Sequence, residues 1–219
     1  MEFFDIILIG MIAAFVLLRL RSELGNKTGN EPMPPAAPPH GMDNRRQGPA
    51  ASQADTRQDA ATVVAFEANP AVRQGLSEIQ RADSRFNPAQ FLEGAQGAYR
   101  MILEAFWQGD LETLKDFLSD DVYAQFAGAV DAREAAEQTL DNRLLDIEKA
   151  EITTAELNGR DAELTVTFNS EIIAVTRDKD GNAVEGNLSD TITVTDVWTF
   201  ARSVKSRDPN WILVATRSG

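Results

Sequence analysis

Hydrophobic residues follow three different patterns along this 219-residue chain. Residues 6–18 carry no charged side chain, and residues 25–69 contain few bulky apolar residues before Val63. Residues 70–219 show regular helical and strand periodicities. The sequence therefore predicts an N-terminal apolar segment with its flank at 1–24, a linker at 25–69 and a folded domain at 70–219.

The first apolar run predicts a helix that spans a membrane. As a helix, Phe3 to Leu20 would be about 27 Å long, against a hydrocarbon core of about 30 Å. A cleaved signal peptide is disfavoured, because the residues before the run are acidic and no small-residue cleavage site follows it. A core helix is disfavoured because the run is apolar on every side. The residues expected in the membrane are Ile6, Ile7, Leu8, Ile9, Phe15, Leu17 and Leu18.

Positive charges flank this run only on its C-terminal side, where Arg19 and Arg21 follow it. The positive-inside rule then places the remainder of the chain in the cytoplasm and the N-terminus outside. The sequence has no cysteine, which agrees with a reducing compartment. The pattern predicts a single-pass membrane protein whose C-terminal domain is cytoplasmic.

The segment at 25–69 has the composition of a tether. Prolines cluster between positions 32 and 39, and Ala, Gln, Asp and Arg dominate the residues that follow. Such a tract buries too little apolar surface to fold, and about 45 residues of coil reach about 35–40 Å. The prolines could bind a proline-reading module, but a plain spacer is favoured.

Apolar residues at helical spacing predict four helices in the first half of the domain, over about 70–85, 88–107, 111–118 and 121–139. Asn87-Pro88 provides the cap and first residue of the longest one. The period then changes to two, which predicts strands over about 146–157, 163–168, 191–200 and 211–216, with a hairpin turn at 178–182. Helices followed by antiparallel strands indicate an α+β domain with its helices on one face of the sheet.

Charge and composition exclude several classes of function. The chain has 21 Lys and Arg against 34 Asp and Glu, a net charge of −13, which disfavours nucleic-acid binding. With no cysteine and one histidine, His40, a metal site, a thiol nucleophile or a catalytic triad has almost nothing to build on. The sequence therefore predicts no metal, no cofactor and no catalytic residues.

The first predicted helix has two possible uses. Its apolar residues Val72, Leu76 and Ile79 lie beside the basic residues Arg73 and Arg81. A basic amphipathic helix can contact lipid headgroups or a partner. Packing of the apolar side on the domain is the favoured alternative.

Asp196 shares a strand face with Trp198 and is expected to point inward. A buried carboxylate of this kind can be a general base of raised pKa, with Tyr99 or Tyr123 as its partner. The favoured alternative is a structural acid satisfied by an arginine, an indole N–H or backbone groups.

Several blocks of this domain resemble one family, the Tim-44-like C-terminal domain of subunit forty-four of the mitochondrial inner-membrane protein-import translocase. The first block is Asp83-x-x-Phe86-Asn87-x-x-x-Phe91-Leu92-x-Gly94-Ala95-x-x-Ala98-Tyr99. The others are Ala105-Phe106-x-x-Gly109-Asp110-x-x-x-Leu114-x-x-x-Leu118, Thr195-Asp196-Val197-Trp198-Thr199-Phe200 and Asp208-Pro209-Asn210-Trp211-x-Leu213-Val214-Ala215-Thr216. The resemblance covers about residues 76–217.

The resemblance implies a nuclear-transport-factor-2-like cone, with a curved antiparallel sheet against helices, an apolar pocket and no enzymatic activity. Bacterial relatives pair this domain with one N-terminal membrane helix, which implies a bacterial inner-membrane location. In mitochondrial relatives the first helices contact cardiolipin, and the first predicted helix corresponds to them. The mitochondrial segment that recruits the Hsp70 motor is replaced here by the proline-rich tether. Candidate pocket residues are Phe91, Tyr99, Phe106, Tyr123, Phe168, Asp196, Trp198 and Trp211.

Together these observations favour a membrane-tethered, non-catalytic adaptor for translocation or envelope assembly. Its expected partners are membrane lipid and an unidentified protein, and not nucleic acid. Two alternatives stay open. The apolar pocket could bind a small molecule or host an enzymatic reaction, or the chain could be a structural subunit that assembles through the small residues Gly10, Ala13 and Ala14 of its anchor.

Overall fold

The computed structural model describes residues 69–219. The predicted anchor, with Ile6–Ile9, Phe15, Leu17, Leu18, Arg19 and Arg21, and the predicted tether lie outside the described residues. Among the residues from 69 onward, no helix is both long and apolar enough to cross a membrane.

Each helix of the domain begins at a side chain that caps its free backbone N–H groups. The caps are Asn69, Asn87, Asp110 and Ser119, and a proline follows each of the two asparagines. This confirms the four predicted helices and the start predicted at Asn87-Pro88. The helices are α3 (Pro70–Ala82), α4 (Pro88–Gln108), α5 (Leu111–Phe117) and α6 (Asp120–Ala135).

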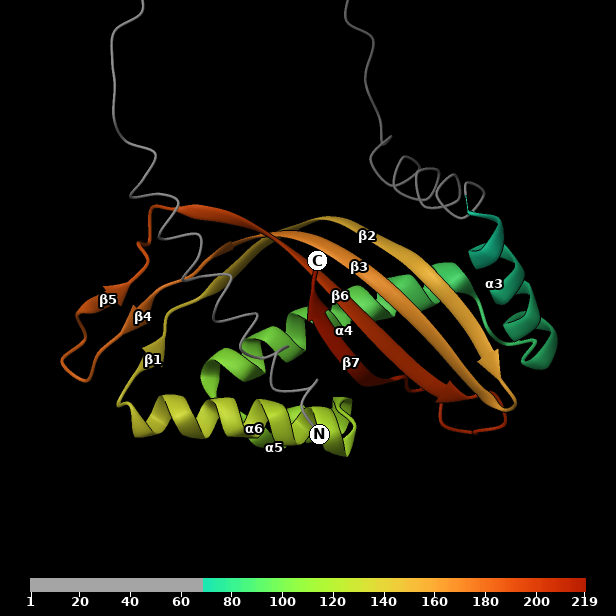
Figure 1. Cartoon of the computed structure of the whole chain (residues 1–219), viewed down its shortest axis with the longest axis horizontal. Helices are drawn as coiled ribbons and strands as arrows, with labels where there is room; N and C mark the ends of the chain where they lie inside the picture. The colour runs from blue at the N-terminus through green and yellow to red at the C-terminus, as the bar shows by residue number, and fades with distance from the viewer. Residues whose placement is uncertain (1–68) are drawn as a thin grey trace, which may run out of the picture.

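The strands form two antiparallel sheets (Figure 1). The larger has the order β2-β3-β6-β7, with β2 at Arg143–Asn158, β3 at Asp161–Ile173, β6 at Thr191–Ser203 and β7 at Ile212–Ser218. The smaller has the order β1-β4-β5, from Thr139–Leu140, Thr176–Arg177 and Ala183–Glu185. The predicted turn at 178–182 joins β4 to β5. It therefore connects two short strands of the smaller sheet and not two long strands of the larger one.

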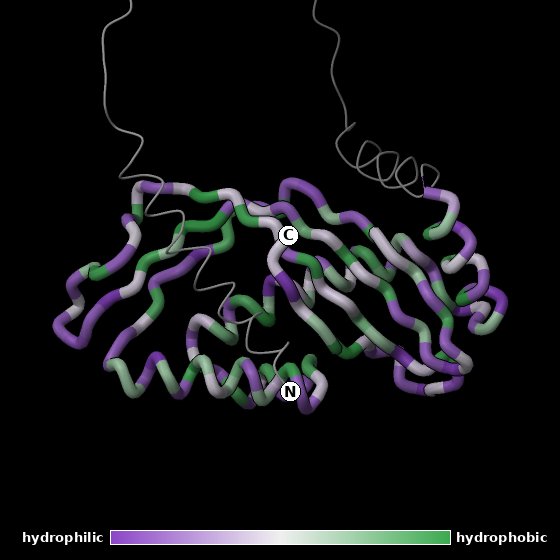
Figure 2. Tube along the Cα trace, in the orientation of Figure 1, coloured by the Kyte–Doolittle hydropathy of each residue, from purple (hydrophilic) through white to green (hydrophobic). Residues whose placement is uncertain are grey.

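The larger sheet curves over α4, which runs along its inner face, while α5 and α6 lie at the side of α4 and α3 lies beside β2 (Figure 1). Hydrophobic and hydrophilic residues alternate along the long strands (Figure 2). On β3 every second residue from Ala162 to Ser170 is buried. This alternation gives the sheet one apolar face, and the structure confirms the predicted helices packed on an antiparallel sheet.

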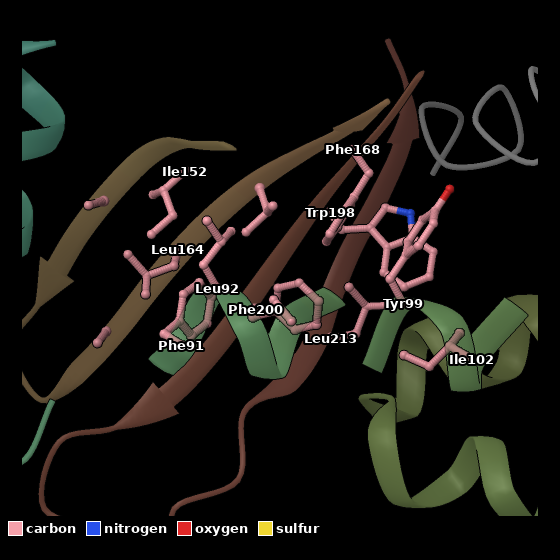
Figure 3. Close-up of a cluster of buried hydrophobic side chains, with 14 of the residues drawn as sticks. Phe91, Leu92, Tyr99, Ile102, Ile152, Leu164, Phe168, Trp198, Phe200 and Leu213 are labelled. Atoms are coloured by element: carbon pink, nitrogen blue, oxygen red, sulfur yellow. The ribbon is translucent and has the colours of Figure 1, made fainter. Parts of the chain in front are cut away.

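The core is built where the apolar stripe of α4 meets β3 and β6 (Figure 3). Tyr99, Phe168 and Trp198 are fully buried, and the Tyr99 ring stacks on Phe168 with 4.3 Å between centroids. Fully burying side chains of this size contributes about 1.5–3 kcal/mol each. These contacts hold α4 in a fixed position on the sheet.

The helix α3 packs closely on the edge strand β2. Val72, Leu76 and Ile79 are 2%, 5% and 0% exposed. A Cβ atom at Gly75 would overlap the carbonyl oxygen of Ala155 on β2, so glycine is required for this approach. The apolar side of α3 is therefore used within the domain.

Candidate functional site

An open groove of about 780 Å³ runs along α4, between this helix, the C-terminal end of α5 and the loop that joins β6 to β7. On the α4 side, Gln90 and Phe91 are followed by the small residues Gly94, Ala95 and Ala98 and then by Met101, which is 45% exposed. A Cβ atom at Gly94 would meet no atom within 4 Å. The groove therefore has room for a larger side chain at Gly94.

Aromatic side chains from the start of α4, from β6 and from the loop between β6 and β7 form one wall of the groove. The Trp211 ring lies 4.7 Å from Phe91 at 63° and 5.9 Å from Phe86, measured between ring centroids. Phe91 in turn contacts Phe200 on β6 at 6.0 Å. Edge-to-face and tilted pairs of this kind add about 0.5–1.5 kcal/mol beyond the area they bury. The wall is therefore a set of aromatic rings packed against one another.

A buried ion pair closes one end of the groove. The Asp83 carboxylate accepts a hydrogen bond from Nη2 of Arg202 at 2.7 Å, and its other oxygen accepts one from Nε of Arg85 at 3.2 Å. The side chains of Asp83 and Arg202 are 4% and 10% exposed, whereas that of Arg85 is 65% exposed. The Arg202 guanidinium lies 4.9 Å from the Trp211 ring centre, which links the ion pair to the aromatic wall.

The charge of Asp83 is secured by its two arginines. Burial by itself would raise the pKa of this carboxyl, but hydrogen bonds from Arg85 and the charges of Arg85 and Arg202 outweigh it and hold the pKa below its usual value. Asp83 is therefore an ionised structural acid and is not poised to act as a base.

The predicted pocket residues fall into three groups. Phe91 and Trp211 line the groove. Phe106 pairs with Phe126 of α6 at 5.0 Å, and Tyr123 is half-buried on the same helix. The other four lie in the core between α4 and the sheet, namely Tyr99, Phe168, Asp196 and Trp198.

Tyr99 and Asp196 come together inside this core. The Tyr99 hydroxyl donates to Oδ2 of Asp196 at 2.6 Å and lies 3.0 Å from the Ser170 hydroxyl. Burial raises the pKa of Asp196, although the Tyr99 hydrogen bond acts to lower it. Burial and the neighbouring carboxylate raise the pKa of Tyr99, which keeps it a neutral donor. None of these residues borders the groove, and the two hydroxyl groups give the buried Asp196 carboxyl its hydrogen-bonded surroundings.

Replacing Tyr99 with Phe should lower the free energy of unfolding near neutral pH by about 1–3 kcal/mol, because a buried carboxylate loses its donor. Because the pKa of Asp196 is raised in the folded state, its contribution to the free energy of unfolding is complete at low pH and is lost as pH rises through that pKa. The variant raises this pKa further, so its deficit should grow with pH. Urea titrations from acidic to mildly alkaline pH measure the free energy of unfolding of this variant, with Tyr123→Phe as the control. A loss of stability that does not change with pH would contradict the role of Tyr99 as the donor to Asp196.

A second, shallower depression of about 440 Å³ lies between α3 and the end of β2, from Thr153 to Asn158. The apolar residues of α3 face β2, while Arg73 and Arg81 are exposed. Of the two uses predicted for this helix, the structure shows packing on the domain. In this arrangement Val72, Leu76 and Ile79 are not available to lipid.

The groove includes residues that sequence reasoning did not single out. Arg202 and Met101 border it and stand in none of the sequence blocks quoted above. Arg202 pairs with a residue 119 positions away, and no local pattern reports such a contact. Among residues 69–219, no group of three or more His, Cys, Asp or Glu side chains could hold a metal ion.

The model of one protein family, the Tim44-like domain, matches residues 72–218. A probable mitochondrial import inner membrane translocase subunit, tin-44 of Caenorhabditis elegans, is 29% identical over 146 residues, which cover 66% of this chain and 34% of that protein. The human mitochondrial import inner membrane translocase subunit TIM44 is 27% identical over 135 residues, covering 61% and 30%. The match thus spans about a third of the length of these relatives.

Two solved structures have weaker likenesses. The intermembrane space region of the chloroplast protein ARC6 gives a TM-score of 0.44 at 14% identity, covering 61% of this chain and 97% of that one. A putative dehydratase of the NTF2-like family from Streptomyces avermitilis gives a TM-score of 0.34 at 17% identity, covering 60% and 97%.

Proposed function

This chain belongs to the Tim44-like domain family, and on that premise we propose that it is a membrane-tethered, non-catalytic adaptor. Its domain binds a protein partner or lipid in the groove beside α4, close to the inner-membrane surface. The groove carries this proposal, because an open, aromatic-walled surface of about 780 Å³ on a folded domain is suited to binding.

The chemistry of the groove supports binding rather than catalysis. The two carboxyl groups that line it, Asp116 and Asp208, are both exposed. Asp83, which is held ionised by Arg85 and Arg202, and Asp196, the acid of raised pKa, do not line it. A general base needs access to a substrate proton, and the burial of Asp196 away from the groove speaks against that role. Binding without chemistry is therefore the better-supported use of the site.

The setting proposed for the adaptor is protein translocation or envelope assembly. The relatives named above are translocase subunits of the mitochondrial inner membrane. The proline-rich tract and the apolar run at 6–18 support a tethered position at a bacterial inner membrane, with the domain in the cytoplasm.

Isolation of the full chain from detergent-solubilised membranes tests the binding role. We expect a protein partner or a retained lipid to co-purify reproducibly, identified by mass spectrometry against a mock isolation. Independent preparations that return neither protein nor lipid would refute the adaptor function.

Deleting residues 3–20 should move the chain from the membrane fraction to the soluble fraction. The chain has a net charge of −13 and so little electrostatic attraction to an anionic leaflet, which leaves the apolar run to hold it at the membrane. Alkaline extraction of membranes followed by immunoblotting measures the distribution. Retention of the deleted variant in the membrane pellet would show that another element holds the chain there.

A further inference from the structure

The prolines at residues 32–39, called here the proline-rich run, have a regular spacing that a plain spacer does not require. Pro32, Pro35 and Pro38 recur at every third position, and the run contains no charged side chain. In the polyproline II conformation, which proline-rich segments favour, about three residues make one turn. These three prolines would therefore share one edge of the segment, which extends over about 19 Å at about 3.1 Å per residue.

The groove beside α4 matches this edge in length and in chemistry. From Gln90 to Met101 it follows eleven residues of α4, about 17 Å at about 1.5 Å per residue. Phe91 and Trp211 line it, with 4.7 Å between their ring centroids. Grooves lined by aromatic rings are a recurring type of binding site for polyproline II segments. Proline rings along one edge of such a segment can pack against this wall.

Side-chain N–H groups beside the aromatic wall suit a ligand that offers carbonyl groups. The Trp211 indole and the side-chain amides of Gln90 and Asn210 border the groove. Within residues 69–219, Gln90 and Asn210 donate through their backbone N–H groups, so their side-chain amides remain for a ligand. A polyproline II segment has carbonyl groups that are not bonded internally and few N–H groups, because proline has none. It supplies acceptors to these donors.

Charge favours an uncharged ligand at the end of the groove near Arg202. The two arginines there, Arg85 and Arg202, stand with the carboxylates of Asp83 and Asp208, so this end has no net charge. Asp116 at the other end is exposed and can stay hydrated. A partner helix would offer carbonyl groups that are already bonded internally, and an acyl chain would offer no acceptor. The proline-rich run fits both the charge and the donors.

The proline-rich run is close enough along the chain to reach this groove. The described domain begins at Asn69, and the 13 residues of α3 lead from there towards Arg85, about 20 Å away at about 1.5 Å per residue. Residues 40–68 join the run to Asn69, and a coil of this length reaches about 30 Å. Being on the same chain also raises the effective concentration of the run at the groove.

We propose that residues 32–39 bind in the groove of the same chain as a polyproline II segment, with Pro32, Pro35 and Pro38 against the aromatic wall. This inference goes beyond the proposed adaptor function, because it needs no partner. Docking leaves residues 21–31 between the predicted anchor and the groove, a reach of about 18 Å against about 35–40 Å for the whole tether. The domain is then held nearer the membrane, and a partner that uses the groove must displace the run.

Disulfide trapping in the purified full chain, kept in detergent, tests this docking. The sequence has no cysteine, so Ala36→Cys in the middle of the run and Gly94→Cys in the groove introduce the only two. A Cβ atom at Gly94 meets nothing within 4 Å, so this variant should fold. Ala89→Cys, which is exposed on the same helix α4 and does not border the groove, replaces Gly94→Cys in the control. Non-reducing gels separate disulfides within one chain from disulfides between two chains.

We expect the disulfide within one chain to form several-fold faster with Gly94→Cys than in the control. Pro35→Ala with Pro38→Ala should then slow it several-fold, because two of the three prolines on the docking edge are lost. Pro34→Ala with Pro39→Ala removes two prolines from the other edges and is the matched comparison. Equal rates at the two cysteine positions, equal rates in the two proline pairs, or disulfides mainly between chains would each overturn the inference. None of these results would refute the adaptor function, which partner recovery tests separately.

Discussion

Replacing Arg202 with methionine should lower the free energy of unfolding by about 3–5 kcal/mol, since it leaves the Asp83 carboxylate buried without its closest partner. The two side chains are 10% and 4% exposed and meet at 2.7 Å. Methionine retains much of the stem that packs beneath the guanidinium, so the loss reports the charge rather than a cavity.

Urea unfolding of the full chain in detergent measures this loss, and Arg85→Met is the matched control. Arg85 also binds Asp83, at 3.2 Å, but its side chain is 65% exposed. An exposed ion pair contributes about 0–1 kcal/mol, so the control should cost far less. Equal losses in the two variants would contradict the assignment of Arg202 as the principal partner of Asp83.

The Arg202→Met deficit should also depend on pH. Because the folded pKa of Asp83 is lowered, its stabilising contribution is complete above the ordinary aspartate value of 3.8 and is lost as pH falls below it. In acid a protonated Asp83 no longer needs the arginine, and the deficit should shrink. A deficit that grows as pH falls would contradict the ion-pair account.

Gly75→Ala should lower the free energy of unfolding by about 1–3 kcal/mol, because the new Cβ atom would overlap the carbonyl oxygen of Ala155. The obstacle is backbone, so no flexible side chain can move aside, and α3 must shift away from β2. Amide hydrogen exchange in α3 should rise at least about tenfold as Val72, Leu76 and Ile79 lose their contacts.

Gly94→Ala is the control for this substitution. Its Cβ atom would meet nothing within 4 Å, and alanine is the better helix former. This variant should therefore gain about 0.4–1 kcal/mol. If both alanine variants gained stability, close packing of α3 on β2 would be refuted.

The helices and strands were predictable because their signals are local. Caps such as Asn87 and the alternation around Phe168 lie within a few residues of the elements they define. Boundaries were less accurate: β3 extends to Ile173, beyond the predicted 168, because its last residues continue to pair with β6. Similarly, α6 ends at Ala135 rather than near 139, since Glu137 adopts a left-handed φ of 53°.

The groove was only partly predictable. Strand parity showed that Asp196 and Trp198 point inward, but inward residues can line a cavity or fill a core, and here they fill the core. The distinction depends on where α4 crosses the sheet, which no residue spacing reports. The ion pair of Asp83 with Arg202 likewise joins two distant segments that meet only in the folded domain.

Partner recovery with Gly94→Leu against Gly97→Leu tests the binding role of the groove most directly. Both glycines lie on α4, and a Cβ atom at either would meet nothing within 4 Å, but only Gly94 borders the groove. In matched isolations of the full chain from membranes, Gly94→Leu should reduce the co-purifying protein or lipid at least about tenfold, about 1.4 kcal/mol of binding, while Gly97→Leu retains it. Equal recovery with both variants would contradict binding in this groove.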